Sequence, residues 1–145
     1  MRTVWTLAVA CVVGAMSIFV VHAQSPSAAN RAANPNGWQI PDGARDEKSP
    51  IASLTPDVLK KGKALYSSHC QKCHGPQGKG DGPDADPEHK PGDLTDGSRA
   101  GRNPDGVMFY KVWNGRKDPK MTAFKTEMSK DEVWTVIEYA KSLRK

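Results

Sequence analysis

The stretch Ser67–Pro83, SSHCQKCHGPQGKGDGP, holds the motif that decides the fold of this chain. Two residues separate Cys70 from Cys73, His74 follows directly, and several glycines come after it. A Cys-x-x-Cys pair is typical of a redox dithiol or of one half of a zinc site, whereas Cys-x-x-Cys-His is typical of covalent haem attachment. The sequence around the motif has to distinguish these three kinds of chemistry.

The surroundings of the motif favour haem attachment. A redox dithiol is expected between a strand and a helix, but this motif follows a predicted helix and has no strand pattern beside it. Zinc needs a fourth ligand and usually a second paired motif, and neither His69 nor His89 has that spacing. We therefore predict one haem c, bound through thioethers at Cys70 and Cys73, with His74 as the proximal iron ligand.

Three helices are predicted along the chain. The first begins after Thr55, which is expected to cap it, with Pro56 at the first helical position. The second lies within residues 103–115, and the third begins at Ser129, which forms a capping box with Glu132. Segments rich in Gly, Pro and Asp separate the helices, and no strand pattern is convincing. The sequence therefore predicts an all-α fold with long loops.

This skeleton has few large apolar side chains for a domain of about 95 residues, 51–145. So small a core buries little surface without help. The segment 75–102 is also long for a loop inside a compact domain, unless it wraps around something. A bulky apolar cofactor in the middle would account for both features.

The first residues, 1–23, have the features of a secretory signal peptide, with Arg2 followed by an apolar run at 4–21. The run is 18 residues long, just enough to span a bilayer, so an uncleaved anchor is the alternative. In either case we expect an exported, periplasmic protein, which residues 4–21 would hold at the cytoplasmic membrane if they are retained. Residues 24–50 are rich in Ala, Asn, Ser, Pro and Gly, and are predicted to be a flexible arm or tether.

Charge and cysteine content exclude several classes of protein. The formal net charge is +5, and without Arg2 it falls to about +4, with 20 Lys and Arg against 16 Asp and Glu. The basic residues are scattered rather than gathered with aromatic residues, so no nucleic-acid partner is predicted. A mildly basic surface favours a partner with an acidic face. Because Cys11 belongs to the predicted signal, only two cysteines remain, too few for a disulfide scaffold.

Residues 55–145 resemble the class I cytochromes c, in particular the short bacterial domains that carry a single haem. The resemblance rests on GKALYSSHCQKCHG at 62–75, MTAF at 121–124 and EVWTVIEYAKSL at 132–143. It implies a cytochrome c-like fold, with the haem between the first and last of three main helices. It also implies that Gly62 and Tyr66 pack against the last helix near Tyr139.

The resemblance further implies an iron ligand on the second side of the haem. Met121 heads MTAF, which is similar to the Met-Pro-Ala-Phe ligand motif of the family, with Thr122 in place of proline. Met108 and Met128 are expected to fill the core. Two further histidines are expected at the surface, His69 and His89.

Two other contacts to the haem region follow only from the resemblance. The carbonyl of Pro91 is expected to accept the ring N–H of His74, and Leu94 is expected to pack on the haem. Ordinary loop structure is the alternative for both residues. Trp113 or Arg116 is a candidate hydrogen-bond donor to a haem propionate.

The sequence thus predicts an exported monohaem c-type cytochrome that carries one electron between larger redox proteins and is not itself an enzyme. Ligation of iron by His74 and Met121 would raise the reduction potential and leave no open coordination site. One alternative is the haem subunit of a periplasmic dehydrogenase or oxidase complex. The other is a gas sensor or peroxidase-like enzyme in which Met121 is a labile ligand.

Overall fold

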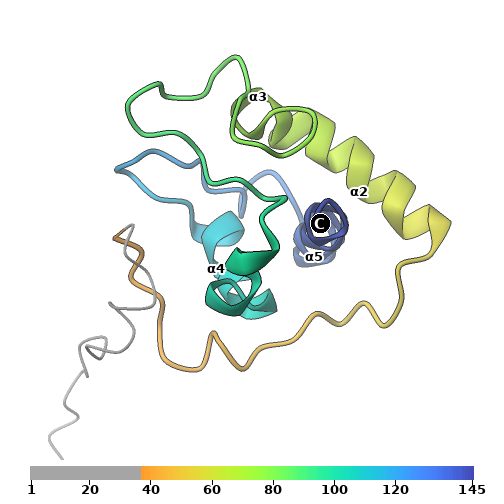
Figure 1. Ribbon diagram of the computed structural model, residues 1–145. Coiled ribbons are helices and arrows are strands. Elements are labelled where there is room, and N and C mark those ends of the chain that lie inside the picture. Colours follow the sequence, from red (N-terminus) through yellow and green to blue (C-terminus); the bar gives the residue numbers. More distant parts are fainter. Residues whose placement is uncertain (1–36) are drawn as a thin grey trace, which may run out of the picture.

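The computed structural model describes residues 37–145, and their regular structure is helical (Figure 1). The elements in chain order are α2 (Pro56–His69), α3 (Gln71–His74), η1 (Gly97–Arg102), α4 (Asp105–Asn114) and α5 (Lys130–Ser142). Within these residues the only strand-like pairing is an isolated antiparallel bridge between Arg116 and Met121. The predicted all-α fold is confirmed. The 3-10 helix η1 lies in a segment that was predicted as loop.

The predicted helix starts are present. The side chain of Thr55 accepts a hydrogen bond from the backbone N–H of Val58 at 3.3 Å, at the start of α2. At the start of α5 the N–H of Ser129 donates to Glu132 Oε2 at 3.0 Å, and the N–H of Glu132 donates to Ser129 Oγ at 3.3 Å. These bonds satisfy N–H groups that the first turn of a helix leaves without a partner.

Helices α2 and α5 pack directly against each other, with α5 seen nearly end-on beside α2 in Figure 1. Gly62 lies at the contact and faces Tyr139 and the carbonyl of Thr135. The buried ring of Tyr66 lies 5.4 Å from the ring of Tyr139, and its hydroxyl donates to the carbonyl of Gly75 at 2.8 Å. The expected packing of Gly62 and Tyr66 near Tyr139 is therefore confirmed, and it connects both helices to the residue after the cysteine motif.

The hydrophobic core lies where α2, α4 and α5 meet. Phe109 of α4 is stacked against two tryptophans, with its ring 4.4 Å from Trp134 and 5.6 Å from Trp113. Removing side chains of this size from water stabilises the fold by about 1.5–3 kcal/mol each. The buried members of the core are Tyr66, Phe109, Phe124, Met128, Val133, Trp134, Val136 and Ile137.

Residues 37–50, here called the N-terminal strap, pack against α4. Ile40 is completely buried. The N–H of Gly106 donates to the carbonyl of Glu47 at 3.1 Å, and a Cβ on Gly106 would collide with the carbonyl of Ala44. The chain then passes along the outside of the molecule to the start of α2 (Figure 1). The packed part of the described chain thus begins before Ile51.

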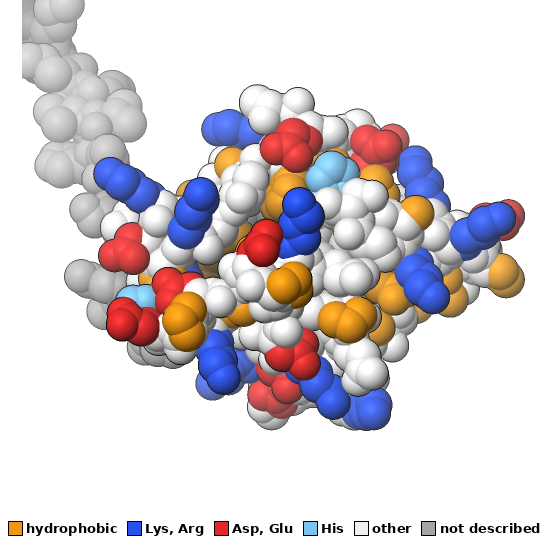
Figure 2. All heavy atoms as spheres, turned by 90° about the horizontal axis from the view of Figure 1, so that it is seen from above, with side chains coloured by type: hydrophobic (Ala, Val, Ile, Leu, Met, Phe, Trp, Pro, Cys, Tyr) orange, Lys and Arg blue, Asp and Glu red, His pale blue; other side chains and the backbone are white. Residues whose placement is uncertain are grey.

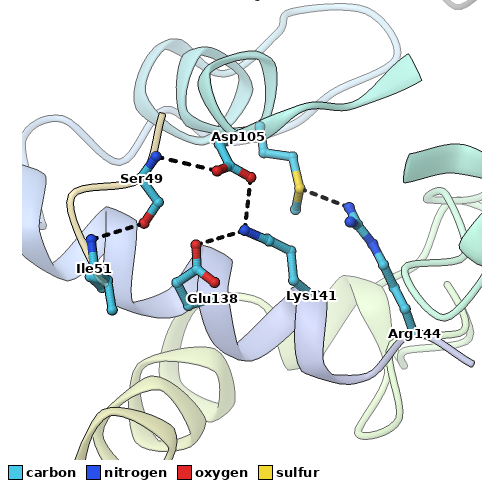
Figure 3. A network of polar contacts seen from close by, with 7 residues as sticks. Ser49, Ile51, Asp105, Glu138, Lys141 and Arg144 are labelled. Carbon is cyan, nitrogen blue, oxygen red and sulfur yellow. Dashed lines mark hydrogen bonds and ion pairs between the residues drawn. The ribbon is translucent and has the colours of Figure 1, made fainter. Parts of the chain in front are cut away.

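A network of polar contacts joins the strap, α4 and α5 (Figure 3). Lys141 Nζ lies 2.8 Å from Asp105 Oδ1 and 2.8 Å from Glu138 Oε1, while Asp105 Oδ2 accepts the N–H of Ser49 at 3.2 Å. Burial acts to raise the pKa of Asp105, but the hydrogen bonds from Lys141 and Ser49 outweigh it and hold this pKa below its usual value. Burial likewise acts to lower the pKa of Lys141, and its two carboxylate partners raise it overall.

The predicted signal peptide or anchor, 1–23, and the first part of the predicted arm, 24–36, lie outside the described residues. Among the helices within 37–145, none combines the length and the apolar character that a membrane crossing requires.

Candidate functional site

The cysteine motif occupies the turn that follows α2. The N–H of Cys70 donates to the carbonyl of Tyr66 at 2.9 Å, so Cys70 ends α2, and the N–H of His74 donates to the carbonyl of Cys70 at 2.9 Å. Residues three and four apart on a helical turn are neighbours, so this turn gathers Cys70, Cys73 and His74 on one side. Both cysteines are free thiols: Cys70 is half-buried against the core, and Cys73 is exposed.

The environment of the thiols does not fit a redox dithiol. Burial, together with the nearby charge of Cys73, raises the pKa of Cys70 to about 12. Redox-active cysteines have a lowered pKa, because the thiolate is the reactive form. The part of the chain from 37 to 145 also contains no strand that could flank the motif. Over the same residues, no group of three or more His, Cys, Asp and Glu side chains is arranged to hold a metal ion.

The imidazole of His74 has the properties of a ligand. Burial lowers its pKa, and a hydrogen-bonding interaction with the backbone of Gly92 partly opposes that effect. The ring is therefore neutral at pH 7, which is the form that binds metals. Its Nδ1 atom is buried and has no partner of regular hydrogen-bond geometry within the described residues. The neutral ring, presented on the same turn as two thiols, fits a metal ligand.

Backbone hydrogen bonds fold the segment 75–84 over the motif. The N–H of Gly80 donates to the carbonyl of His74 at 2.9 Å, and the N–H of Gly82 donates to the carbonyl of Cys73 at 3.2 Å. The last carbonyls of a helix otherwise lack partners. The glycines after the motif therefore hold the attachment turn in place, a role that the sequence pattern did not identify.

Pro91 and Leu94 both lie close to this region. The carbonyl of Pro91 contacts Gly80, and the next residue, Gly92, has its backbone beside the ring of His74. The N–H of Leu94 donates to the carbonyl of Gly78 at 2.7 Å, and its half-buried side chain packs against the core. The expected bond from His74 to the Pro91 carbonyl and the expected contact between Leu94 and the haem stay predictions.

Met121 is carried by a short hairpin after α4. The N–H of Met121 donates to the carbonyl of Arg116 at 2.8 Å, and the N–H of Arg116 donates back at 2.8 Å. Three residues further on, the N–H of Phe124 donates to the carbonyl of Val112 at 3.1 Å, and the ring of Phe124 is buried in the core. These contacts anchor the half-buried Met121 on both sides without a proline at Thr122.

Within residues 37–145, the remaining methionines and histidines contact other parts of the protein. Met128 is 4% exposed and belongs to the core, as expected. Met108 is half-buried, and its sulfur accepts a hydrogen bond from Arg144 Nη2 at 3.1 Å (Figure 3).

The two other histidines of the described chain lie closer to the surface. The ring of His69 packs edge-on against Phe124 with 5.6 Å between centroids, so His69 is partly covered rather than a plain surface residue. The exposed His89 lies 3.4 Å from Asp86.

Comparisons with known proteins agree with this picture. Residues 59–144 match the family model for cytochrome c. Photosystem II extrinsic protein V of Cyanidium caldarium is 43% identical over 37 residues, which are 26% of this chain and 23% of that protein. A chain of the reducing HAO-like protein complex of Kuenenia stuttgartiensis superposes with a TM-score of 0.57 and 31% identity, over 68% of this chain and 50% of that chain. The chain thus spans about a quarter of the curated relative and half of the structural one.

Proposed function

The chain belongs to the cytochrome c family, and from this premise we propose that it is an exported monohaem electron carrier whose iron is ligated by His74 and Met121. The family binds haem c covalently, and Cys70 and Cys73 provide the two thiols for it. At the level of the family it is an electron-transfer protein rather than a catalyst. The proposal adds the pair of iron ligands, the location and the partners.

The observation that carries the proposal is the placing of two thiols and one neutral imidazole on a single turn. When bound, the haem iron supplies a one-electron couple. Cys70 and Cys73 would hold the haem at the end of α2 through two thioether bonds. His74 is presented from the same turn, so attaching the haem would also bring its iron to the imidazole. A thioether ligand opposite the histidine raises the potential and closes the second side to small ligands.

The loop around Met121 supports its assignment as the second ligand. Its backbone is paired with Arg116, and it is anchored in the core by Phe124, so the methionine does not depend on a proline for its position. A carrier gains from this arrangement because rigid ligands keep the geometry of the site similar in both oxidation states. Pro91 and Leu94 are proposed as supporting contacts, one orienting His74 and the other covering the haem.

The proposed partners are the redox proteins that donate and accept the electron. Lys and Arg outnumber Asp and Glu by 21 to 16 over the whole sequence. Figure 2 shows basic side chains spread over one face among acidic ones. A surface of this kind favours docking to an acidic face, mainly through the rate of association. Export is proposed from the signal-like residues 1–23, with attachment to the cytoplasmic membrane if residues 4–21 are retained.

The test is the optical spectrum of the purified holoprotein in both oxidation states, with carbon monoxide added to the reduced form. We expect a low-spin c-type spectrum, a weak red sulfur-to-iron band in the oxidised protein and no response to carbon monoxide. Met121→Ala should abolish the red band and allow carbon monoxide to bind, while Met108→Ala should do neither. If the wild-type protein binds carbon monoxide readily, the site is open, and a gas sensor or peroxidase-like enzyme replaces the carrier.

A second candidate is a haem subunit of a larger redox complex. The observation that favours it is the 31% identity to half of a chain from the reducing HAO-like complex. Size-exclusion chromatography of the native protein with mass analysis would separate the two candidates. A free carrier elutes as a monomer, whereas a subunit elutes with a second redox protein that reduces its haem when substrate is added.

A further inference from the structure

Five basic side chains from four parts of the chain gather beside α4. We call Arg45, Arg99, Arg102, Lys111 and Arg116 the cationic cluster. Arg45 comes from the strap, Arg99 and Arg102 from η1, Lys111 from α4 and Arg116 from the hairpin. Burial, together with the positive charges of the four arginines, lowers the pKa of Lys111 to about 8. Like charges placed so close destabilise each other unless an anion joins them.

The described protein offers this cluster few counter-charges. Lys111 Nζ donates to a neutral acceptor, Asn103 Oδ1, at 2.6 Å. Asp96 lies 3.3 Å from Arg99 Nε, and within residues 37–145 no carboxylate comes within 4.0 Å of Arg45, Arg102 or Lys111.

One nitrogen atom of the cluster is buried with no acceptor and no carboxylate beside it. Arg45 Nη2 makes no hydrogen bond within the described residues, although it is not open to solvent. Arg99 Nε also lacks a regular hydrogen bond, but Asp96 already lies 3.3 Å from it. A buried charged donor without an acceptor is costly. Arg45 therefore has the form of one half of an anion site, with an acceptor of negative charge as the other half.

The cluster borders the proposed iron ligand. Arg99 Nη1 lies 2.6 Å from the position that a Cβ on Gly92 would occupy. The backbone of the same glycine interacts with the ring of His74. A haem attached at the cysteine motif carries two propionate carboxylates at one edge, which are anions of the kind that arginine binds best.

The strap holds Arg45 between two fixed points. On one side the ring of Trp38 lies 4.7 Å from the guanidinium carbon of Arg116 and 5.3 Å from Lys111 Nζ. On the other side, the carbonyls of Ala44 and Glu47 contact Gly106. The strap also lies outside the region that matches the family model, which begins at residue 59. Arg45 therefore adds a positive charge from outside the matched region to the four basic residues of the cluster that lie within it.

We propose that the cationic cluster binds the propionate carboxylates of the covalently attached haem, and that the strap supplies Arg45 to close this site. The inference rests on the same haem as the proposed function, and it assigns a role to a segment that the sequence suggested was only a tether. A cation beside the haem stabilises the reduced iron, which carries one positive charge less than the oxidised iron. Removing that cation should therefore lower the reduction potential.

The test compares Arg45→Gln with Lys48→Gln in the holoprotein. Both variants remove one positive charge from the strap, but Lys48 is exposed and does not belong to the cluster. For Arg45→Gln we expect a threefold to tenfold shift of the redox equilibrium toward the oxidised form, where tenfold corresponds to about 59 mV. The propionate NMR signals should shift with it. Lys48→Gln should change neither, and Arg45→Lys should recover most of the potential.

The outcomes separate this inference from the proposed function. If the wild type has a reversible couple but Arg45→Gln behaves like Lys48→Gln in both potential and propionate signals, the inference is wrong and the carrier proposal stands. If the wild type has no reversible couple, the carrier proposal fails, and the propionate signals alone decide the role of Arg45.

The same variants distinguish propionates from a free anion. With the propionates in place, inorganic phosphate at constant ionic strength should leave the potential of the wild type unchanged. If phosphate shifts the potential of the wild type but not that of Arg45→Gln, the cluster takes an anion from solution, and the inference is overturned.

Discussion

A Cβ atom added to Gly115 would lie 2.5 Å from the carbonyl oxygen of Met121 and 2.5 Å from the backbone nitrogen of Ala123. Gly115 also has a φ of +61°, a conformation that side chains with a Cβ rarely adopt. The residue that ends α4 thus sets the path of the loop that presents Met121. No sequence motif pointed to this relationship.

Gly115→Ala should therefore loosen the ligand loop. Gly115 combines its positive φ with a ψ of −170°, a conformation that is essentially restricted to glycine and costs about 1–3 kcal/mol with a Cβ. The contact with the backbone at 121–123 also requires that segment to move. We expect the oxidised holoprotein to lose part or all of its red sulfur-to-iron band, and the reduced form to bind carbon monoxide. Gly101→Ala is the control, since nothing lies within 4 Å of a Cβ at Gly101. An unchanged spectrum in Gly115→Ala would mean that this loop does not carry the ligand.

Gly62→Ala should destabilise the protein, although alanine is the better helix former by about 1 kcal/mol. A Cβ at this position would lie 2.6 Å from Tyr139 Cβ and 2.8 Å from the carbonyl of Thr135, so α2 and α5 would have to separate. Overpacking of this kind costs about 1–3 kcal/mol. Urea unfolding of the holoprotein measures the difference. Gly101→Ala should stay within about 0.5 kcal/mol of wild type, and a Gly62→Ala variant as stable as that control would contradict the packing argument.

Lys141→Met tests the network between the strap, α4 and α5. The change leaves Glu138, which is only 6% exposed, without its cation, and it removes a hydrogen bond from Asp105. Hydrogen bonds to charged groups contribute about 1.5–3 kcal/mol each, and partial exposure of Lys141 reduces this, so we expect a loss of about 2 kcal/mol in urea unfolding. Lys125→Met, at an exposed position in the loop before α5, should have little effect. Equal stability of the two variants would show that the network is neutral.

Low pH should lower the free energy of unfolding partly by protonating the carboxylate of Asp105. Its pKa is lowered in the folded state from an ordinary value of 3.8, so the unfolded chain binds more protons at low pH. The stabilisation is therefore complete above about pH 4, and it is lost as the pH falls through the folded pKa. Asp105→Asn should flatten the decline of the urea midpoint below about pH 4. Asp46→Asn, an exposed change in the strap, should leave the decline unchanged, and an equally steep decline in Asp105→Asn would rule out this carboxylate as its cause.

Much of the fold could be predicted because its signals are local. Thr55 and the pair Ser129 and Glu132 mark helix starts through side chains that reach only a few residues along the chain. The Cys-x-x-Cys-His motif is likewise local, because its two cysteines and its histidine lie on one helical turn. The packing of Gly62 near Tyr139 followed from resemblance to a family, because nothing local in the sequence connects residues so far apart.

The sequence by itself determined the three main helices, the haem attachment turn and the family, since each depends on residues that are close together along the chain. Only the tertiary structure decided that the strap packs against α4, that Gly115 shapes the loop of Met121, and that Arg45 joins the cationic cluster. Trp38 and Ile40 were visible as isolated apolar residues, but their partners were not. Contacts of this kind bring together charges and backbones from distant segments, and no periodic pattern in the sequence records which segments will meet.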